Sequence, residues 1–214
     1  MRPAYRFAIG LAVIGTVFVV VGDRRDPFLW AYLGLFAALA LYALLSIDDD
    51  LAKERFTPPT SGADGLSLRQ VRLIAAAHIL AGVLDSRFKW TSVPDPWRLL
   101  GLVGFGLGFL LVVEAMKTNR FFSSVVRIQN DRGHRVVDQG AYSWVRHPGY
   151  AGMIWSIPLG GLAMGSWLAV GFGLVYAALI LRRVLFEDQF LQTNLDGYKA
   201  YTGRVRYRLI PGLW

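Results

Sequence analysis

Residues 133–152 read Gly-His-Arg-Val-Val-Asp-Gln-Gly-Ala-Tyr-Ser-Trp-Val-Arg-His-Pro-Gly-Tyr-Ala-Gly. This stretch contains His134 and His147, two of the three histidines of the protein, together with two arginines and two tyrosines. A long apolar region begins at the end of the stretch, at Ala151. Polar side chains that can bind or react therefore stand next to a segment that has the composition of a membrane span, and we interpret the rest of the chain as their scaffold.

The composition of the chain is that of a membrane protein. Of the 214 residues, 54% are hydrophobic and 18% are charged, and the mean hydropathy is +0.40. Ordinary soluble domains have a charged share nearer to one quarter. We therefore expect an all-α, polytopic integral membrane protein.

The formal net charge of +8 does not indicate a nucleic-acid partner, because no basic helix or RNA-binding signature accompanies it. Positively charged cytoplasmic loops account for such a charge in a membrane protein. The absence of cysteine excludes disulfides, thiolate nucleophiles and Cys-ligated zinc. Three adjacent acids at 48–50 point in different directions on a helical turn, so we expect a solvated helix exit there and no metal site, followed by a polar connection over 51–65.

Four apolar segments in the N-terminal part, 1–116, predict transmembrane helices at about 7–21, 28–47, 66–84 and 99–116. The first segment resembles a signal peptide, but no small-x-small cleavage site follows it and a second apolar segment begins six residues later. The third segment is weaker because it carries Arg69, Arg72 and His78. Periodicity alone does not decide whether it crosses the membrane.

The distribution of positive charge favours the crossing. With six transmembrane helices, 18 of the 23 lysines and arginines lie on one side of the membrane, whereas five helices, with 66–84 not crossing, give 14 against 9. The positive-inside rule therefore predicts six helices with both termini in the cytoplasm. His78 then becomes an intramembrane ionisable residue, either a functional group or a neutral histidine bonded to a neighbouring helix.

Glycine pairs occur in two of the apolar segments. Gly104, Gly106 and Gly108 match the first part of a glycine-rich nucleotide loop, but no strand precedes them. Gly104 with Gly108, and Gly161 with Gly165, have the small-xxx-small spacing of closely packed helices. We therefore expect helix packing at both pairs.

The second part of the chain, 117–214, is organised around a helical hairpin. A polar cytoplasmic segment at 117–149 is followed by an apolar hairpin at 150–181 and an amphipathic tail at 182–214. Because a hairpin of two crossings returns the chain to the side it left, the polar segment and the tail meet at one face. Glu187 and Asp188 are thereby brought to the Arg- and His-rich stretch.

The order of these motifs resembles the isoprenylcysteine carboxyl methyltransferase family, which is related to the integral-membrane phospholipid methyltransferases. The resemblance covers about residues 117–211, and residues 119–123 and 126–129 are similar to a bacterial branch of the family. It rests on the following motifs: Gly133-His134, Val136-Val137, Gly140-Ala141-Tyr142, residues 145–152, the apolar hairpin, Glu187-Asp188, and a basic tail ending in Leu209-Ile210-Pro211.

The resemblance implies methyl transfer from S-adenosylmethionine, bound in a cytoplasm-facing pocket. In the family the tripeptide at 140–142 is usually Gly-Pro-Tyr and the acid at 188 is commonly glutamate, so Ala141 should reduce rigidity and Asp188 contacts a ligand less readily than Glu187 does. The implied catalytic residues are Arg146, His147 and Glu187. The implied cofactor-binding residues are His134, Val137, Gly140, Tyr142, Arg146, His147, Pro148, Tyr150, Gly152, Glu187, Asp188, Tyr198 and Tyr201.

The chemistry of these side chains suits that cofactor. Arg146 or a histidine can pair with its carboxylate, Glu187 can accept a hydrogen bond from its ammonium group or a ribose hydroxyl, and the rings of Tyr142 and Tyr150 can attract cationic groups. Transfer is an in-line displacement that depends on alignment in a water-poor site. A base, Glu187 or His147, is needed only for an acceptor that arrives protonated.

Two other classes of protein stay open at this point. Membrane sterol reductases share an Arg-His-x-x-Tyr stretch and use NADPH, although they tend to have further Asn and Asp residues around it. A non-catalytic transporter or scaffold would bind no cofactor. For the methyltransferase we expect an amphiphilic or lipid substrate that enters from the bilayer of a bacterial inner membrane. A prenylated cysteine, a phospholipid amine, a quinone-like phenol and a small thiol are the candidate acceptors.

Overall fold

The computed structural model describes residues 3–56 and 65–214, and this part of the chain is all-helical, as expected. Two 3-10 helices, η1 (Asn130–Arg132) and η2 (Gly140–Ser143), lie in the segment between α5 and α6. The α-helices are α1 (Pro3–Val21), α2 (Pro27–Ser46), α3 (Asp49–Phe56), α4 (Gly65–Phe88), α5 (Asp95–Thr118), α6 (Pro148–Ala163), α7 (Trp167–Asn194) and α8 (Tyr198–Arg204).

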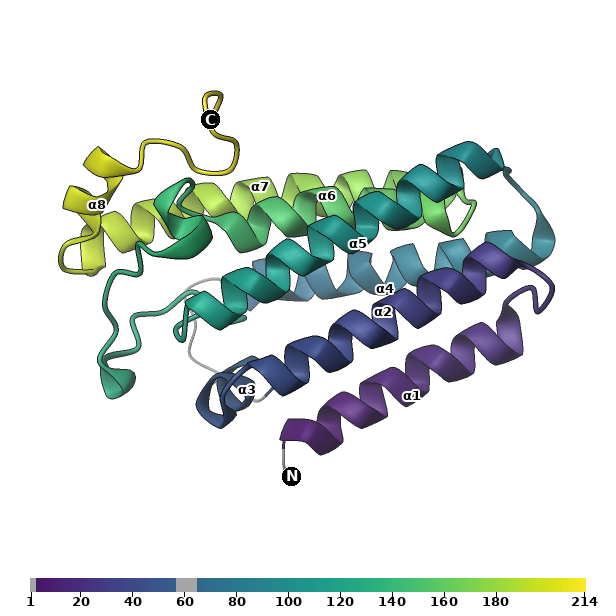
Figure 1. Ribbon diagram of the computed structural model, residues 1–214, viewed down its shortest axis with the longest axis horizontal. Helices are drawn as coiled ribbons and strands as arrows, with labels where there is room; N and C mark the ends of the chain where they lie inside the picture. Colours follow the sequence, from purple (N-terminus) through teal and green to yellow (C-terminus); the bar gives the residue numbers. More distant parts are fainter. Residues whose placement is uncertain (1–2, 57–64) are drawn as a thin grey trace.

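The six longer helices lie alongside one another along the long axis of the molecule (Figure 1). Three tight connections, at 22–26, 89–94 and 164–166, share one end of the bundle. At the other end lie α3, the segment between α5 and α6, and α8 (Figure 1). The hairpin of α6 and α7 therefore returns the chain to the end at which residues 119–147 lie, as the sequence predicted.

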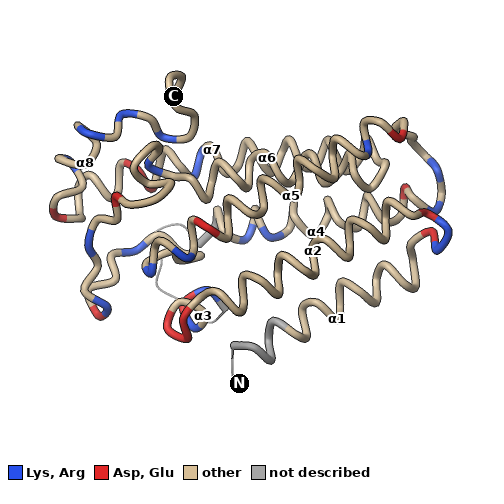
Figure 2. The backbone as a smooth tube through the Cα atoms, in the orientation of Figure 1, with Lys and Arg blue, Asp and Glu red and all other residues tan. Residues whose placement is uncertain are grey.

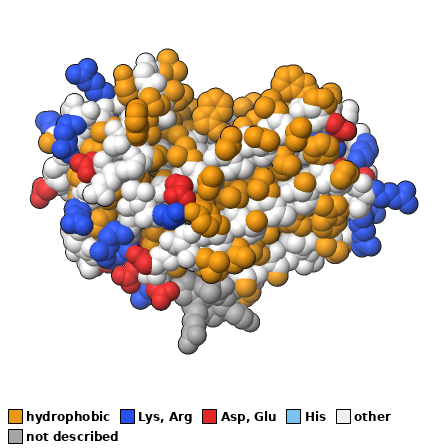
Figure 3. Space-filling view, in the orientation of Figure 1, with side chains coloured by type: hydrophobic (Ala, Val, Ile, Leu, Met, Phe, Trp, Pro, Cys, Tyr) orange, Lys and Arg blue, Asp and Glu red, His pale blue; other side chains and the backbone are white. Residues whose placement is uncertain are grey.

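The exterior of the bundle fits a bilayer. Charged residues lie toward its two ends (Figure 2), and hydrophobic side chains cover much of the surface between them (Figure 3). In the described part of the chain, four helical segments are long and apolar enough to cross a membrane: Pro27–Ser46, Ser67–Phe88, Asp95–Thr118 and Trp167–Asn194. The weak segment predicted at 66–84 is thus a long apolar helix. The apolar part of α1, Ala8–Val21, and the 16-residue α6 are shorter, so the total of six crossings remains a prediction.

One helix was not expected. The acids at 48–50 were interpreted as a solvated helix exit followed by a polar connection over 51–65, and this was wrong for residues 51–56, which belong to α3. The Asp48 carboxylate accepts a hydrogen bond from the backbone N–H of Leu51 at 2.6 Å. Asp49 and Asp50 occupy the first turn, where negative charge is favourable. The remainder of that connection, 57–64, lies outside the described residues.

The α5–α6 contact depends on glycine. A Cβ at Gly152 would lie 2.4 Å from the carbonyl oxygen of Gly108, and a Cβ at Gly104 would lie 2.4 Å from the Leu159 side chain. The packing role predicted for Gly104 and Gly108 is therefore confirmed. Gly161 likewise approaches the backbone of Val170 on α7.

Gly165 departs from the packing prediction. Its φ of +81° places it in the left-handed region, in the turn between α6 and α7. The residue is needed there for its backbone conformation, and a Cβ added to it would also lie 2.9 Å from Arg98 Nε of α5. Gly161 packs closely against α7, and Gly165 lies four residues later in the connection between α6 and α7. The pair therefore has the spacing of a packing motif although only Gly161 makes the contact between these two helices.

Buried polar contacts hold the end of the bundle that has the tight connections. Asp26 caps α2 and pairs with Arg98 of α5, with 2.7 Å between carboxylate and guanidinium. Asp85 of α4 accepts hydrogen bonds from the backbone N–H of Thr91 and from the Ser166 hydroxyl. His78 bonds through Nδ1 to the carbonyl of Ala169 on α7 at 2.9 Å, which agrees with the interpretation of a histidine bonded to a neighbouring helix.

The contact at Gly152 predicts the effect of one methyl group. We expect Gly152→Ala to lower the free energy of unfolding by about 1 to 3 kcal/mol, because the added Cβ overlaps the α5 backbone. Gly171→Ala on α7 is the matched control, since no heavy atom lies within 4 Å of its added Cβ. Thermal unfolding of the purified variants in detergent measures both, and an unchanged midpoint for Gly152→Ala would contradict the packing.

Candidate active site

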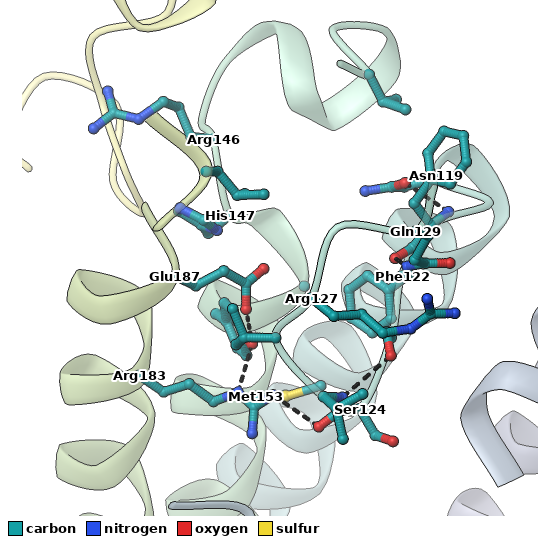
Figure 4. A pocket seen from close by; sticks show the side chains of 18 of the residues that line it. Asn119, Phe122, Ser124, Arg127, Gln129, Arg146, His147, Met153, Arg183 and Glu187 are labelled. Carbon is teal, nitrogen blue, oxygen red and sulfur yellow. Dashed lines mark hydrogen bonds between the residues drawn. The ribbon is translucent and has the colours of Figure 1, made fainter. Parts of the chain in front are cut away.

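A cavity of about 330 Å³ lies at the end of the bundle that carries α3 and α8. Residues 119–147 and the helices α3, α4, α6, α7 and α8 all contribute to its wall. Figure 4 shows some of the lining side chains, with Glu187 and Arg183 on one helix and Asn119, Gln129 and Arg127 on the loop opposite. Nine of the predicted site residues line it: His134, Val137, Tyr142, Arg146, His147, Tyr150, Glu187, Tyr198 and Tyr201.

Four other predicted residues do not line the cavity but shape it. Gly140 has φ +56° and opens η2, which carries Tyr142. Pro148 is the first residue of α6, where its fixed φ suits the helix and its missing N–H is not needed. Gly152 packs against α5, and Asp188 points into the protein.

Asp188 is the centre of a buried polar network, with a side chain only 1% exposed. Six donors lie within hydrogen-bond distance of its carboxylate: Arg146 Nε (2.8 Å) and Nη2 (3.0 Å), His147 Nε2 (3.2 Å), the Tyr198 hydroxyl (3.0 Å), Arg208 Nε (3.0 Å) and Gln192 Nε2 (3.0 Å). Donation from His147 to this carboxylate requires the tautomer with the proton on Nε2. Asp188 thus joins α7 to the loop before α6, to α8 and to the C-terminal tail.

Arg146 is held on both sides. Its Nη1 donates to the carbonyls of Val205 (2.9 Å) and Arg206 (2.7 Å), so four of its five N–H donors are satisfied within the protein. The backbone N–H groups of Arg146 and His147 also donate to carbonyls of the tail, each at 2.9 Å. The bidentate side of Arg146 that could have received a ligand carboxylate is occupied by Asp188.

Glu187, one residue earlier, faces the cavity. The Tyr150 hydroxyl donates to Glu187 Oε2 at 2.5 Å and accepts from Arg183 Nε at 2.8 Å, and Arg183 Nη2 donates to the carbonyl of Ser124 at 2.7 Å (Figure 4). Within the described residues, Glu187 Oε1 has no hydrogen-bond partner. The hydrogen bonds from Arg183 to Tyr150 and from Tyr150 to Glu187 therefore fix the Glu187 carboxylate and leave its Oε1 available to a ligand.

Sequence reasoning did not foresee the link from Arg183 to Glu187 through Tyr150. It also assigned no role to Asn119, Arg127 or Gln129, which line the cavity. These three lie within, or at the ends of, the two short stretches that resemble the bacterial branch of the family. That local similarity was the signal that could have identified them.

The loop that covers the cavity is anchored to α3. Glu54 accepts hydrogen bonds from Arg127 (3.0 Å) and from the Ser123 hydroxyl (2.7 Å). Burial acts to raise the pKa of Glu54, but these hydrogen bonds outweigh it and hold the pKa below its ordinary value. The carboxylate is therefore charged at neutral pH, and the short helix α3 fixes the loop.

His134 is packed on the same loop as a neutral group. Its ring lies 4.6 Å from that of Phe121, and its Nδ1 accepts from the backbone N–H of Gln129 at 3.3 Å. Burial, together with the charges of Arg127 and Arg132, lowers the pKa of His134 to about 4. At neutral pH its Nε2 therefore carries the proton and can donate to a ligand.

The sequence of the chain is similar to those of known methyltransferases. Residues 99–193 match the model of the Isoprenylcysteine carboxyl methyltransferase (ICMT) family. A probable protein-S-isoprenylcysteine O-methyltransferase of Oryza sativa subsp. japonica is 32% identical over 148 residues, which cover 67% of this chain and 78% of the relative. Protein-S-isoprenylcysteine O-methyltransferase B of Arabidopsis thaliana is 26% identical over 138 residues, which cover 61% of this chain and 70% of the relative.

The fold is also similar to a solved structure, that of the eukaryotic intramembrane Ras methyltransferase ICMT. The two superimpose with a TM-score of 0.63 at 19% sequence identity, over 97% of this chain and 75% of the other. The fold and the site thus define a multi-pass integral membrane methyltransferase. The chain belongs to the isoprenylcysteine carboxyl methyltransferase family. This membership decides against the reductase and transporter alternatives.

The Asp188 network predicts a large loss of stability on removal of one charge. We expect Asp188→Asn to lower the free energy of unfolding by about 3 to 5 kcal/mol, because it leaves the buried Arg146 without a counter-charge. Asp138→Asn is the matched control, since Asp138 pairs with Arg204 at an exposed position and such pairs contribute little. Thermal unfolding in detergent compares the two, and equal midpoints would contradict the central role of Asp188.

Proposed function

We propose that this protein transfers the methyl group of S-adenosylmethionine to an amphiphilic acceptor that reaches the cavity from the bilayer. The observation that carries the proposal is the fixed carboxylate of Glu187, which faces a cavity formed jointly by a polar loop and membrane helices. We further propose that the protein belongs to a bacterial branch of the family. It would then lie in the bacterial inner membrane with both termini in the cytoplasm.

The residues of the polar part of the cavity fit this cofactor. The volume of the whole cavity falls at the lower end of the range of small-molecule sites, about 300 to 1,000 Å³. Glu187 Oε1 can accept from the ammonium group or a ribose hydroxyl, and the Nε2–H of His134 can donate. Since the fork of Arg146 is occupied, Arg135 is the better candidate for the cofactor carboxylate. It lines the cavity and forms no ion pair within the described residues.

The residues of the chain orient the reactants and exclude water from the site. When bound, the cofactor supplies a methyl group activated by its sulfonium. Tyr142, Tyr198 and Tyr201 are buried and line the cavity, where their rings can attract positive charge and exclude water. Glu187 is held by Tyr150, so it can orient a ligand without a loss of side-chain freedom on binding. For an acceptor that arrives protonated, Glu187 is also close enough to the cavity to take the proton.

The far part of the cavity fits an apolar chain. Leu68, Val71 and Ala75 of α4 line it together with Tyr176 and Ile180 of α7. Both helices are long and apolar enough to cross the membrane. An amphiphile in the bilayer can therefore place its chain against these side chains and its head toward the polar part. The names of the relatives specify O-methylation of isoprenylcysteine, which is one member of this class of acceptor.

Cofactor binding tests the proposal directly. We expect purified wild-type protein to bind S-adenosylmethionine saturably and to transfer labelled methyl groups to a component of host lipid extract. Glu187→Gln should weaken donor binding about tenfold or more, because a charge-assisted hydrogen bond is lost. Glu114→Gln, which changes an exposed acid outside the cavity, is the control. Saturable binding of NADPH with none of S-adenosylmethionine would refute the assignment.

Orientation can be tested because the protein has no native cysteine. Ser92 lies between α4 and α5, and Ala200 lies on α8 at the opposite end of the bundle; both are exposed. We expect a membrane-impermeant maleimide to label Ser92→Cys in intact cells, and to label Ala200→Cys only after the inner membrane is permeabilised. Labelling of both positions from the same side would contradict the proposed topology.

A further inference from the structure

Two arginines in the membrane-side part of the cavity have no anionic partner. Arg55, near the end of α3, and Arg72, on α4, both line the cavity. Neither forms an ion pair or a hydrogen bond with any residue that the structure describes. The guanidinium of Arg55 lies over the ring of Phe122, 5.1 Å from its centroid, and this ring also lines the cavity.

The fold holds both arginines toward the cavity. Glu54, next to Arg55, binds Arg127 and Ser123 and thereby fixes α3 against the loop. On α4 the residues that line the cavity are Leu68, Val71, Arg72 and Ala75, which share one face of the helix. Arg69 is on the same helix but does not line the cavity, so the position of Arg72 follows from helical periodicity and not from a general excess of arginine.

Within residues 3–56 and 65–214, no acid pairs with Arg55 or Arg72. Burial has the largest effect and lowers the pKa of Arg55; Tyr150 and Tyr176 raise it, and the nearby cations Arg183 and Arg72 lower it. Glu187, the acid among the described residues that line the cavity, is hydrogen-bonded to Tyr150. A half-buried guanidinium among like charges is costly, and an anion bound between them would relieve that cost.

We propose that Arg55 and Arg72 form an oxyanion subsite that binds the phosphate or carboxylate head of a membrane amphiphile, whose chain lies along Val71, Ala75 and Ile180. Guanidinium groups match the planar or tetrahedral oxygens of such heads with paired N–H donors. Both arginines lie outside residues 99–193, so the subsite belongs to the N-terminal part of the chain. It deepens the proposed function, because it gives the acceptor an anionic head.

Equilibrium binding to the full-length protein in phosphatidylcholine nanodiscs tests the subsite, with empty nanodiscs subtracted and no methyl donor present. The probes are dodecyl phosphate, dodecanoate at pH 8.5, uncharged dodecanol and inorganic phosphate. We expect at least one anionic amphiphile to bind about tenfold more tightly than dodecanol. Because no donor is present, failure of S-adenosylmethionine binding and failure of the subsite are separate results.

Variants connect the binding to the two arginines. We expect Arg55→Gln and Arg72→Gln each to weaken binding of the anionic amphiphile about tenfold, Arg55→Lys to retain part of it, and Arg69→Gln to bind as wild type. Arg72 is exposed, so its variant carries the test even where Arg55→Gln lowers the thermal midpoint.

The outcomes separate the sources of the anion. Tighter binding of dodecyl phosphate than of dodecanoate assigns a phosphate head, and the reverse assigns a carboxylate head. Inorganic phosphate that binds as tightly as dodecyl phosphate would overturn the amphiphile and leave a site for a free anion. Equal binding of dodecanol and both anionic amphiphiles, or an Arg69→Gln variant as weak as Arg72→Gln, would overturn the subsite.

Discussion

The buried carboxylate of Asp188 is the interaction on which the site depends. It receives donors from the loop before α6, from α7 and α8 and from the C-terminal tail, and with Arg146 it forms a buried ion pair whose two partners are 42 residues apart in the chain. A carboxylate this deeply buried is tolerated only because donors surround both of its oxygens. Consecutive residues on a helix point about 100° apart, so a helix that aims Asp188 into this network turns Glu187 toward the cavity.

Close packing of α5, α6 and α7 allows that network to form. Neighbouring helices in a bilayer gain little from the hydrophobic effect, so their association relies on close contact between small residues. Gly108 and Gly152 provide this contact between α5 and α6, and Gly161 provides it between α6 and α7. The turn at Gly165 then reverses the chain. The result is that the end of α7 lies beside the loop 119–147, which comes from the end of α5.

The cavity divides into two parts with different chemistry. The polar part is formed by residues that belong to the family motifs, including His134, Tyr142 and Glu187. The membrane-side part is lined by residues of α3 and α4, which precede the region matched by the family model, and by Tyr176 and Ile180 of α7, which lie within that region. The short helix α3 serves both parts, since Glu54 anchors the covering loop while Arg55 lines the cavity. The N-terminal part of the chain is thus more than a membrane anchor for the methyltransferase core.

The sequence by itself determined the all-helical membrane class, the hairpin, the family and nine of the residues that line the cavity, because apolar periodicity and ordered motifs are local properties. Only the tertiary structure decided which partner each polar group has. It assigned the fork of Arg146 to Asp188, connected Arg183 to Glu187 through Tyr150, placed Gly165 in a turn and revealed α3 as part of the site. The physical reason is that hydrogen bonds and ion pairs are short-ranged and directional, so the partner of a side chain depends on where helices distant in sequence come together.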